Sequence, residues 1–336
     1  MKLFIIGILF AISFNAFEQQ NEAIKTILGA IISHAEEASL YRNDVDWKIL
    51  KGEIYDMASD ANSVAELKPA LKYLLKSLGD GHGRIFHNNQ ILANHDSGTK
   101  AHHSTLQNDI YNNVQMGRVY KFHTEMLGKD IGYVRIVGLP MGDNQQMAKE
   151  IQDGVCNLIE NGAKKWILDL RYNGGGNMHP MAEGIASIIR NGKVGGSKGL
   201  TDDESSIWKV ENSDFYYDDY SVHLANDCKT SNNPKVAVLT SVYTASSGEA
   251  IAVIFKEREN TKFFGEKTLG MITVTDWHVI DNSTAMTISV SYYKDRNGNV
   301  YDKYVDVDVE IPFVALPLSD EDEAVEEAKV WLEDEN

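Results

Sequence analysis

The sequence is poor in positive charge. Its 336 residues include 32 lysines and arginines against 49 aspartates and glutamates, so the net charge is −17 at pH 7. A chain this acidic is repelled by nucleic-acid phosphates, and we do not expect it to bind nucleic acid. Many of the acidic residues lie in 319–336, which the pattern predicts to be an acidic C-terminal tail with a solvated helix face.

Long apolar runs are also scarce, apart from one at the start. Lys2 is followed by about twelve apolar residues and then by Asn15 and Ala16. This order is typical of a secretory signal peptide, and the run is too short to cross a bilayer. We therefore predict a signal peptide over residues 1–16, a mature chain beginning near Phe17, and a periplasmic or secreted protein with no stable membrane anchor. The alternative is a buried N-terminal strand or helix.

Cysteine is rare as well, with two in the chain. A chain of this length, 43% apolar, can bury a core without disulfide or metal staples. In an oxidising compartment Cys156 and Cys228 could pair. Cys156 lies on an expected helix among apolar residues, however, where a free buried thiol is the alternative.

The hydrophobic pattern changes along the chain. Apolar residues at helical spacing predict a small helical N-terminal domain over residues 17–83. Residues 84–129 are polar and are expected to form a connecting segment of loop and short strands. Between residues 130 and 318, apolar strand patterns alternate with helical ones, which predicts an α/β core. Residues 192–234 are expected to be an irregular insertion within this core.

Three turns rich in glycine or serine carry the candidate chemistry. The first, LGDGHG over residues 78–83, places His82 among glycines directly after a helix. The second, DLRYNGGGN over 169–177, and the third, TASSGE over 244–249, each follow an apolar strand and precede a helix. Function in α/β sheets concentrates at the carboxyl ends of strands, so the last two turns are candidates for one site.

Each turn also has a simpler interpretation. His82 alone could be an exposed or packing histidine, the glycines could form a plain turn, and Ser246 or Ser247 could merely cap a helix. Functionally, successive glycines leave backbone N–H groups free to face an anion. A serine at such a bend exposes its hydroxyl where N–H groups and the helix dipole favour an oxyanion.

Other site types fit less well. No G-K-[ST] follows the glycines, so a phosphate-binding loop is not indicated. No G-x-S-x-G is present, which argues against an α/β-hydrolase that would use His278 with Asp276 or Asp281. The histidines between residues 87 and 123 show neither a helical pair nor a cysteine partner, so no metal site is expected.

Taken together and in this order, the motifs resemble one serine peptidase family. It comprises the C-terminal processing peptidases, the tricorn core and the interphotoreceptor retinoid-binding proteins. The resemblance extends roughly from Asp46 to Ile311 and rests on LGDGH, GYVRI, ILDLRYNGGGN, VAVLT, TASSGEA, FFGEKTLG and VDVDVEI. It implies a crotonase-like spiral of strand-strand-helix units with a small helical N-terminal domain, peptide or protein substrates, and no cofactor.

Two departures place the chain within that family. Processing peptidases use a Ser-Lys dyad whose lysine follows a T-x-G segment, but here Met271 follows Thr268–Gly270. A thioether is no base, and Lys267 lies four residues earlier, so we do not expect it to substitute. Those peptidases also carry a PDZ domain, for which residues 87–129 are too few. The tricorn-like branch, which pairs serine with histidine, is the better match.

The resemblance therefore implies a Ser-His mechanism. Ser246 is expected to be the nucleophile, with Ser247 as the alternative, and His82 the general base. An unperturbed histidine pKa near 6.5 suits that role at neutral pH. The backbone N–H groups of Gly175 or Gly176 and of Ser247 are expected to bind the oxyanion.

An orienting acid is expected at Asp302, because the tricorn-like branch places a carboxylate shortly before its closing strand. Asp306 and Asp308 are alternatives, since Val307 stands where the family usually has proline. The rival function is a non-catalytic ligand- or peptide-binding protein on the same fold, as in the retinoid-binding relatives. The aromatic residues between Gly192 and Cys228 are expected either to line one wall of a cleft or to pack on the surface.

Overall fold

The computed structural model describes residues 22–95, 112, 122–224, 228–230, 233–313 and 318–334. The predicted signal peptide lies outside the described residues. The chain divides into two compact units, one comprising Met1–Gly98 with Thr275–Val290 and the other Thr99–Val274 with Ser291–Asn336. The predicted division at residues 83/84 and 129/130 differs from this one, because residues 84–94 and a segment from far along the chain join the first unit.

The first unit contains the expected helices. They are a helix over residues 22–38, α2 (Trp47–Met57), the 3-10 turn η1 (Val64–Leu67) and α3 (Lys68–Leu78). The α2 helix begins where the Asp46 side chain accepts hydrogen bonds from two backbone N–H groups of its first turn. The α3 helix ends at Gly79, whose φ of 71° is left-handed and favours glycine. The helices bury one leucine- and isoleucine-rich cluster between them.

A four-stranded antiparallel sheet packs with these helices. Its strand order is β13-β14-β1-β2, formed by His278–Val279, Thr284–Thr287, Arg84–His87 and Gln90–Asn94. His87 pairs with Thr284, so residues almost 200 positions apart share a sheet. The buried Ile85, Ala93 and Met286 join the helical core from one face of this sheet.

The second unit is built around a six-stranded sheet of order β16-β11-β10-β5-β4-β3. The strands are β3 (Phe122–Leu127), β4 (Ile131–Ile136), β5 (Lys165–Asp169), β10 (Val236–Thr240), β11 (Thr261–Gly265) and β16 (Val309–Glu310). All pair in parallel except β3 with β4. The central strands are buried throughout, as expected for a parallel sheet covered on both faces.

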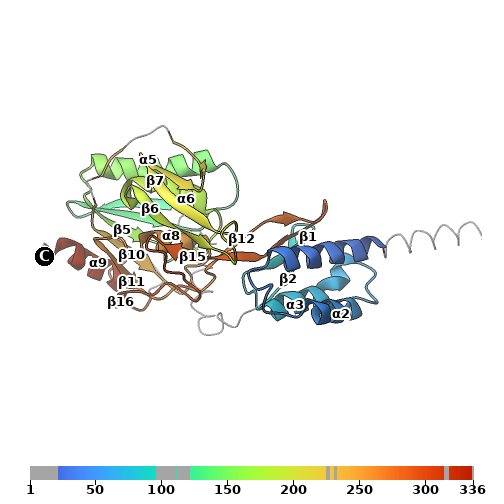
Figure 1. The fold of residues 1–336 in the computed structure, drawn as a ribbon. Coiled ribbons are helices and arrows are strands. Elements are labelled where there is room, and N and C mark those ends of the chain that lie inside the picture. The colour runs from blue at the N-terminus through green and yellow to red at the C-terminus, as the bar shows by residue number, and fades with distance from the viewer. Residues whose placement is uncertain are drawn as a thin grey trace, which may run out of the picture. The chain divides into compact units, whose positions relative to one another are not determined.

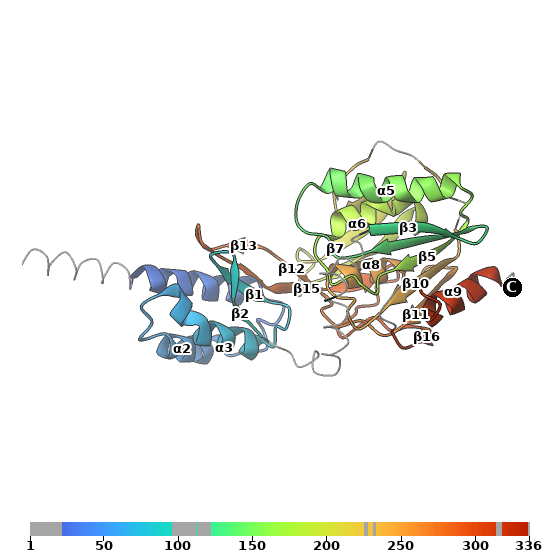
Figure 2. The same ribbon diagram turned by 180° about the vertical axis from the view of Figure 1, so that it is seen from behind.

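Helices cover both faces of this sheet (Figures 1 and 2). One face packs on α5 (Asn144–Glu160), α6 (Met178–Gly184), α7 (Ala186–Ile189) and α8 (Ser247–Phe255). Every residue of α8 is buried, which marks it as the central helix. The other face packs on α9 (Glu323–Glu333) through Ala324, Val325, Ala328 and Leu332. The predicted acidic tail is therefore in part a packed helix, whose glutamates are exposed whereas Asp322 at its start is buried.

A second six-stranded sheet has the order β12-β15-β6-β7-β8-β9. It is formed by Thr273–Thr275, Ser289–Asp295, Gly192–Lys198, Ser206–Glu211, Asp214–Tyr217 and Tyr220–Ser221. The prediction of an irregular insertion over residues 192–234 is wrong for 192–221, which form an antiparallel meander. Its buried Trp208, Val210 and Phe215 belong to the main core of the unit.

The mixed α/β architecture with a helical N-terminal region confirms the predicted fold class. In the ranges that the structure describes, no helix combines the length and apolarity needed to cross a bilayer. Cys156 on α5 and Cys228 are joined by a disulfide, with a Cα–Cα distance of 5.5 Å and a sequence separation of 72 residues. Of the two alternatives that the sequence left open, a disulfide or a free Cys156 thiol, the structure shows the disulfide.

The disulfide is expected to stabilise the second unit. Closing a loop of this length lowers the entropy of the unfolded chain, so replacing Cys156 and Cys228 by alanine should lower the free energy of unfolding by about 4 kcal/mol. Urea unfolding followed by circular dichroism measures this change. Wild-type protein unfolded under reducing conditions should match the double variant. A difference from oxidised wild type below about 1 kcal/mol would contradict the prediction.

Candidate active site

The glycine turn after β5 is anchored by a buried ion network. The Arg171 guanidinium donates to both carboxylate oxygens of Asp169 and to both of Asp322, at 2.6–3.0 Å. The Tyr133 hydroxyl donates to Asp169 at 2.6 Å. Burial raises the pKa of Asp169, but the charge and hydrogen bonds of Arg171 outweigh burial, and the pKa lies below its ordinary value. The network ties the start of the turn to the start of α9.

The serine turn after β10 lies against the glycine turn and is bonded to it. The Ser241 hydroxyl donates to the Arg171 carbonyl at 2.6 Å and the Thr244 hydroxyl to the Leu170 carbonyl at 2.9 Å. The Ala245 N–H donates to the Asn173 carbonyl at 3.0 Å. Two turns about 70 residues apart in sequence therefore form one unit, as the parallel pairing of β5 and β10 requires.

Ser246 is the last residue before α8 and has an unusual backbone. Its φ of 53° and ψ of −119° lie in a region that residues other than glycine rarely occupy. Such a conformation costs about 1–3 kcal/mol and persists only where the surroundings impose it. Its N–H donates to the Glu249 carboxylate at 2.8 Å. Burial raises the pKa of the Tyr293 hydroxyl, which hydrogen-bonds with the Ser246 side chain.

Glycine is required where the two turns meet. A Cβ on Gly175 would lie 2.8 Å from the Ser246 Cβ and 3.3 Å from its Oγ. A Cβ on Gly176 would lie 1.9 Å from the Leu139 carbonyl oxygen. Both glycines have a positive φ, 105° and 108°. The backbone of the glycine turn therefore packs directly against the Ser246 side chain.

The hydrogen bonds discriminate between the predicted roles. The Ser247 hydroxyl donates to the Gly176 carbonyl at 2.5 Å, so it already has a structural partner. The Gly175 N–H donates to the Asn173 side chain at 3.0 Å. Among the described residues, no hydrogen-bond acceptor faces the N–H of Gly176 or of Ser247. These contacts favour Ser246 over Ser247 as nucleophile, and the N–H groups of Gly176 and Ser247 as oxyanion donors.

His82 lies in the first unit on a turn organised by a buried carboxylate. Asp80 accepts hydrogen bonds from the N–H groups of His82 and Gly83 at 3.0 and 2.8 Å. It also accepts from the N–H and hydroxyl of Ser289 at 2.9 and 2.8 Å. Four donors thus surround Asp80 and hold the His82 backbone, and the His82 side chain is partly buried. The turn is therefore shaped by Asp80 and not by its glycines alone.

The three candidates for the orienting acid differ in their surroundings. Asp302, Asp306 and Asp308 are all exposed, and they differ in their hydrogen bonds. The Asp308 carboxylate accepts the Phe263 N–H at 2.7 Å, which joins the closing strand to β11. Asp308 therefore has a structural role.

The 268–271 segment, where processing peptidases carry a lysine, lies beside the serine turn. Its Gly270 N–H donates to Glu249 at 2.8 Å, and Met271 follows. The Lys267 ammonium lies 4.7 Å from the centre of the Tyr304 ring. Lys267 therefore packs over the Tyr304 ring.

The model of peptidase family S41 matches residues 130–311 of this sequence. That range is more than half of the chain and contains both turns of the second unit.

The chain belongs to peptidase family S41.

Individual relatives agree with this assignment. The nisin-resistance protein of Lactococcus lactis is 22% identical over 81% of this chain and 78% of its own length. The carboxy-terminal processing protease CtpA of Bacillus subtilis is 28% identical over 60% of this chain and 40% of its own length. A lipoprotein structure from Streptococcus agalactiae superposes with a TM-score of 0.69 and 20% identity, covering 92% of this chain and 95% of that one.

The photosystem II D1 C-terminal processing protease has the same fold, with a TM-score of 0.55 at 15% identity over 93% of this chain and 97% of that one. The resemblance inferred from the motifs is confirmed, and the S41 chain is a serine peptidase.

The aromatic residues between Gly192 and Cys228 of this S41 peptidase have different surroundings. Trp208 and Phe215 are buried in the core. The rings of Tyr217 and Tyr220 instead pack against His179, with centroid distances of 5.5 and 4.9 Å. His179 lies on the first turn of α6, directly after the glycine turn. The tyrosines are therefore placed near the site by the meander that the sequence did not reveal.

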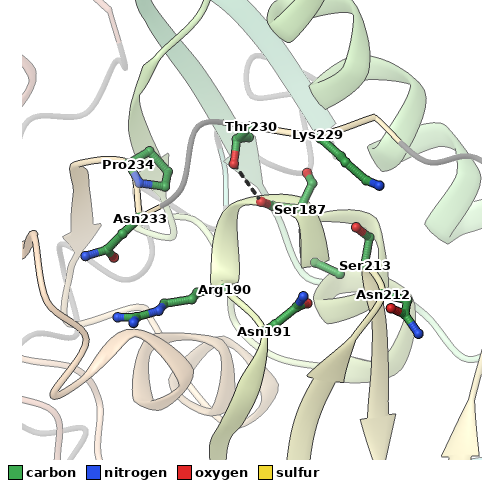
Figure 3. A pocket seen from close by; sticks show the side chains of 10 residues that line it. Ser187, Arg190, Asn191, Asn212, Ser213, Lys229, Thr230, Asn233 and Pro234 are labelled. Carbon is green, nitrogen blue, oxygen red and sulfur yellow. Dashed lines mark hydrogen bonds between the residues drawn. The ribbon is translucent and has the colours of Figure 1, made fainter.

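A separate polar cavity of about 530 Å³ lies elsewhere in the second unit of the S41 chain (Figure 3). Its wall includes Ser187, Arg190, Asn212 and Lys229, and the Thr230 hydroxyl donates to the Ser187 carbonyl at 2.9 Å. None of the predicted catalytic residues lines it. This cavity is therefore not the candidate active site.

Sequence reasoning missed the two groups that organise the turns of this S41 peptidase. Asp80 lies in the LGDGHG motif and Glu249 in the TASSGE motif, but neither has a role predicted from the sequence. The available signal was position, because an acid three residues after a helix-start serine forms a capping box. In Asp80 the decisive partner, Ser289, is 209 residues away and leaves no local signal.

Gly175→Ala should disable the S41 site without unfolding the chain. The added methyl group would press on the Ser246 side chain and shift the adjoining Gly176 N–H, and loss of one oxyanion donor costs about a hundredfold or more in rate. Labelling of Ser246 by a fluorophosphonate probe measures the effect. Gly142→Ala is the matched control, because its Cβ would meet only the Met147 Cε, at 3.7 Å. Labelling of Gly175→Ala at the wild-type rate would contradict this account.

Proposed function

We propose that this chain is an exported serine endopeptidase with Ser246 as nucleophile and His82 as general base. The strained Ser246 backbone carries the proposal, since it holds a hydroxyl at the start of α8 and directly against the glycine turn. Strain of this kind clusters at catalytic positions. The adjoining N–H groups of Gly176 and Ser247 are oriented by the same two turns.

The reaction follows from these groups. His82 accepts the hydroxyl proton as Ser246 Oγ bonds to the substrate carbonyl carbon. The carbonyl electron pair moves onto oxygen, and the N–H groups of Gly176 and Ser247 stabilise that oxyanion. The C–N bond then breaks, and His82 gives its proton to the leaving amine. Water, activated by the same base, hydrolyses the acyl-enzyme and frees Ser246.

The proposal assigns no catalytic role to a lysine. Met271 has no basic group, and Lys267 lies over the Tyr304 ring. Asp302 is proposed to orient His82. The alternative Asp308 is less suited, because its carboxylate binds the Phe263 N–H.

The proposed substrate is a peptide or an unstructured protein segment. One relative is named for resistance to nisin and others for carboxy-terminal processing, which supports this class. The negative net charge weakly favours basic or neutral peptides through long-range attraction.

The pairing of Ser246 with His82 can be tested by a double-mutant cycle. Ser246→Ala and His82→Ala should each lower casein hydrolysis by about 10³-fold or more, because nucleophile and base act as one unit. The double variant should be little worse than either single variant. Independent, multiplying losses would show that the two residues do not cooperate.

Lys267→Ala is the control for this cycle, and it should keep most of the activity. If the folded Lys267→Ala variant were inactive, a Ser-Lys mechanism would take the place of the Ser-His mechanism. A chain that never labels with a fluorophosphonate would instead favour the non-catalytic binding function.

Export is tested separately. The apolar N-terminal run and the Cys156–Cys228 disulfide support it, because disulfides persist in oxidising compartments. N-terminal sequencing of the protein from its native cell should begin near Phe17. An intact Met1 on soluble cytosolic protein would contradict export.

A further inference from the structure

The Glu249 carboxylate lies at the centre of contacts between the nucleophile turn and the 268–271 segment. It is fully buried on the first turn of α8. One oxygen accepts the Ser246 N–H at 2.8 Å. The other accepts the Thr268 hydroxyl at 2.6 Å and the Gly270 N–H at 2.8 Å. The Met271 N–H adds a further hydrogen bond.

Every partner of this carboxylate is a donor. The Thr268 oxygen accepts the Val305 N–H at 2.9 Å, so the hydroxyl proton points to Glu249. The other partners are backbone N–H groups, which can only donate. A proton on Glu249 would therefore face another hydrogen, and the arrangement is satisfied only by the ionised carboxylate.

We propose that Glu249, as an ionised carboxylate, is the positioning residue that holds Ser246 in its reactive backbone conformation and fixes it to the 268–271 segment. This inference rests on the proposed role of Ser246 as nucleophile. Glu249 contacts no substrate atom and acts through the Ser246 N–H.

Burial raises the pKa of Glu249 to about 7, although hydrogen bonds from Thr268, Gly270, Ser246 and Met271 oppose the rise. From β15 the titratable group that faces it is the Tyr293 hydroxyl. The 268–271 segment presents the Thr268 hydroxyl and N–H groups, while the nearby Lys267 lies over Tyr304.

Protonation of Glu249 should therefore occur within the working range of a histidine base. Two groups, His82 and Glu249, must then lose a proton before Ser246 reacts. The logarithm of the rate should rise with a slope approaching two on the acid side of the profile, whereas a single base gives a slope of one.

The stability consequence has the opposite sign. Because the folded pKa is raised above the unfolded value near 4.5, the folded chain binds more protons between these pH values. Stability contributed by neutral Glu249 is thus lost as pH rises through about 7. Glu249→Gln removes the buried charge, so it should remain folded at pH 8.

The experiment measures fluorophosphonate labelling of the purified full chain against pH. At pH 8 Glu249→Gln should label about 10- to 100-fold more slowly than wild type, since the amide leaves at least one buried donor unpaired. Its acid limb should have a slope of one. Glu249→Asp keeps the charge but is too short to bridge both sides, so it should also be slow.

Glu183→Gln is the matched control. Glu183 is likewise buried with a pKa raised to about 7 by burial, but it accepts the Phe215 N–H and does not touch the nucleophile turn. It should keep the wild-type labelling rate and the slope of two. Thermal unfolding of each variant at pH 8 verifies that it is folded.

The outcomes separate this inference from the proposed function. Wild-type labelling that requires Ser246 and His82, together with a folded Glu249→Gln variant of unchanged rate and slope, would overturn the role of Glu249 alone. Absence of labelling at Ser246 in wild type would overturn the proposed function itself. A slow Glu249→Gln variant whose slope stays at two would also contradict the inference.

Discussion

Buried carboxylates surrounded by hydrogen-bond donors hold both candidate catalytic turns. Removing a charge from water is costly unless hydrogen bonds replace the lost hydration. Asp80 recovers this cost through two N–H groups of its own turn and two donors of Ser289, and Glu249 does so through Ser246, Thr268 and Gly270. In each case the carboxylate joins a candidate catalytic residue to a segment remote in sequence. The position of each candidate residue therefore depends on the packing of its whole unit.

The second unit can impose strain on Ser246 because its surroundings are rigid. The residue lies between β10, which is buried throughout, and α8, whose residues are all buried. Hydrogen bonds from Ser241 and Thr244 prevent the serine turn from relaxing away from the glycine turn. On the other side, Gly176 lies so close to the Leu139 carbonyl that the glycine turn cannot retreat. Close packing thus sustains an unfavourable backbone conformation where the proposed reaction needs it.

The sequence predicts the strands, helices and turns whose structure is determined by residues that are close together in the chain. It predicts the apolar runs at β4, β5 and β10, the α8 helix and the glycine and serine turns, and the family assignment is confirmed. The failures concern partners distant in sequence. Polar residues 84–94 form strands because residues 284–287 pair with them, and the 192–221 meander is stabilised by core contacts of Trp208 and Phe215.

Even a local signal failed where a competing geometry was available. Ser63 and Glu66 have the sequence spacing of a capping box, but none forms, because Ser63 makes no side-chain capping hydrogen bond and Glu66 instead accepts the Asn62 N–H. Ser246 and Glu249 have the same spacing, and here Glu249 does accept the Ser246 N–H. Glu66 and Glu249 differ in how many further hydrogen bonds the carboxylate oxygens accept. Glu66 makes one exposed contact, whereas Glu249 is buried and also binds Thr268 and Gly270, so tertiary structure selects the arrangement that sequence only permits.

The proposed mechanism separates positioning of the nucleophile from proton transfer, and Met271 lies where the two would divide. Glu249 holds the 268–271 segment through the Thr268 hydroxyl and through backbone N–H groups, none of which depends on the side chain at 271. Replacing a basic side chain there removes a base but leaves the hydrogen bonds that shape the Ser246 turn. A peptidase can therefore lose the lysine and keep its nucleophile geometry, provided that another segment supplies the base. The turn around His82 is likewise held by a buried carboxylate, that of Asp80, and it is the segment that we propose to supply the base.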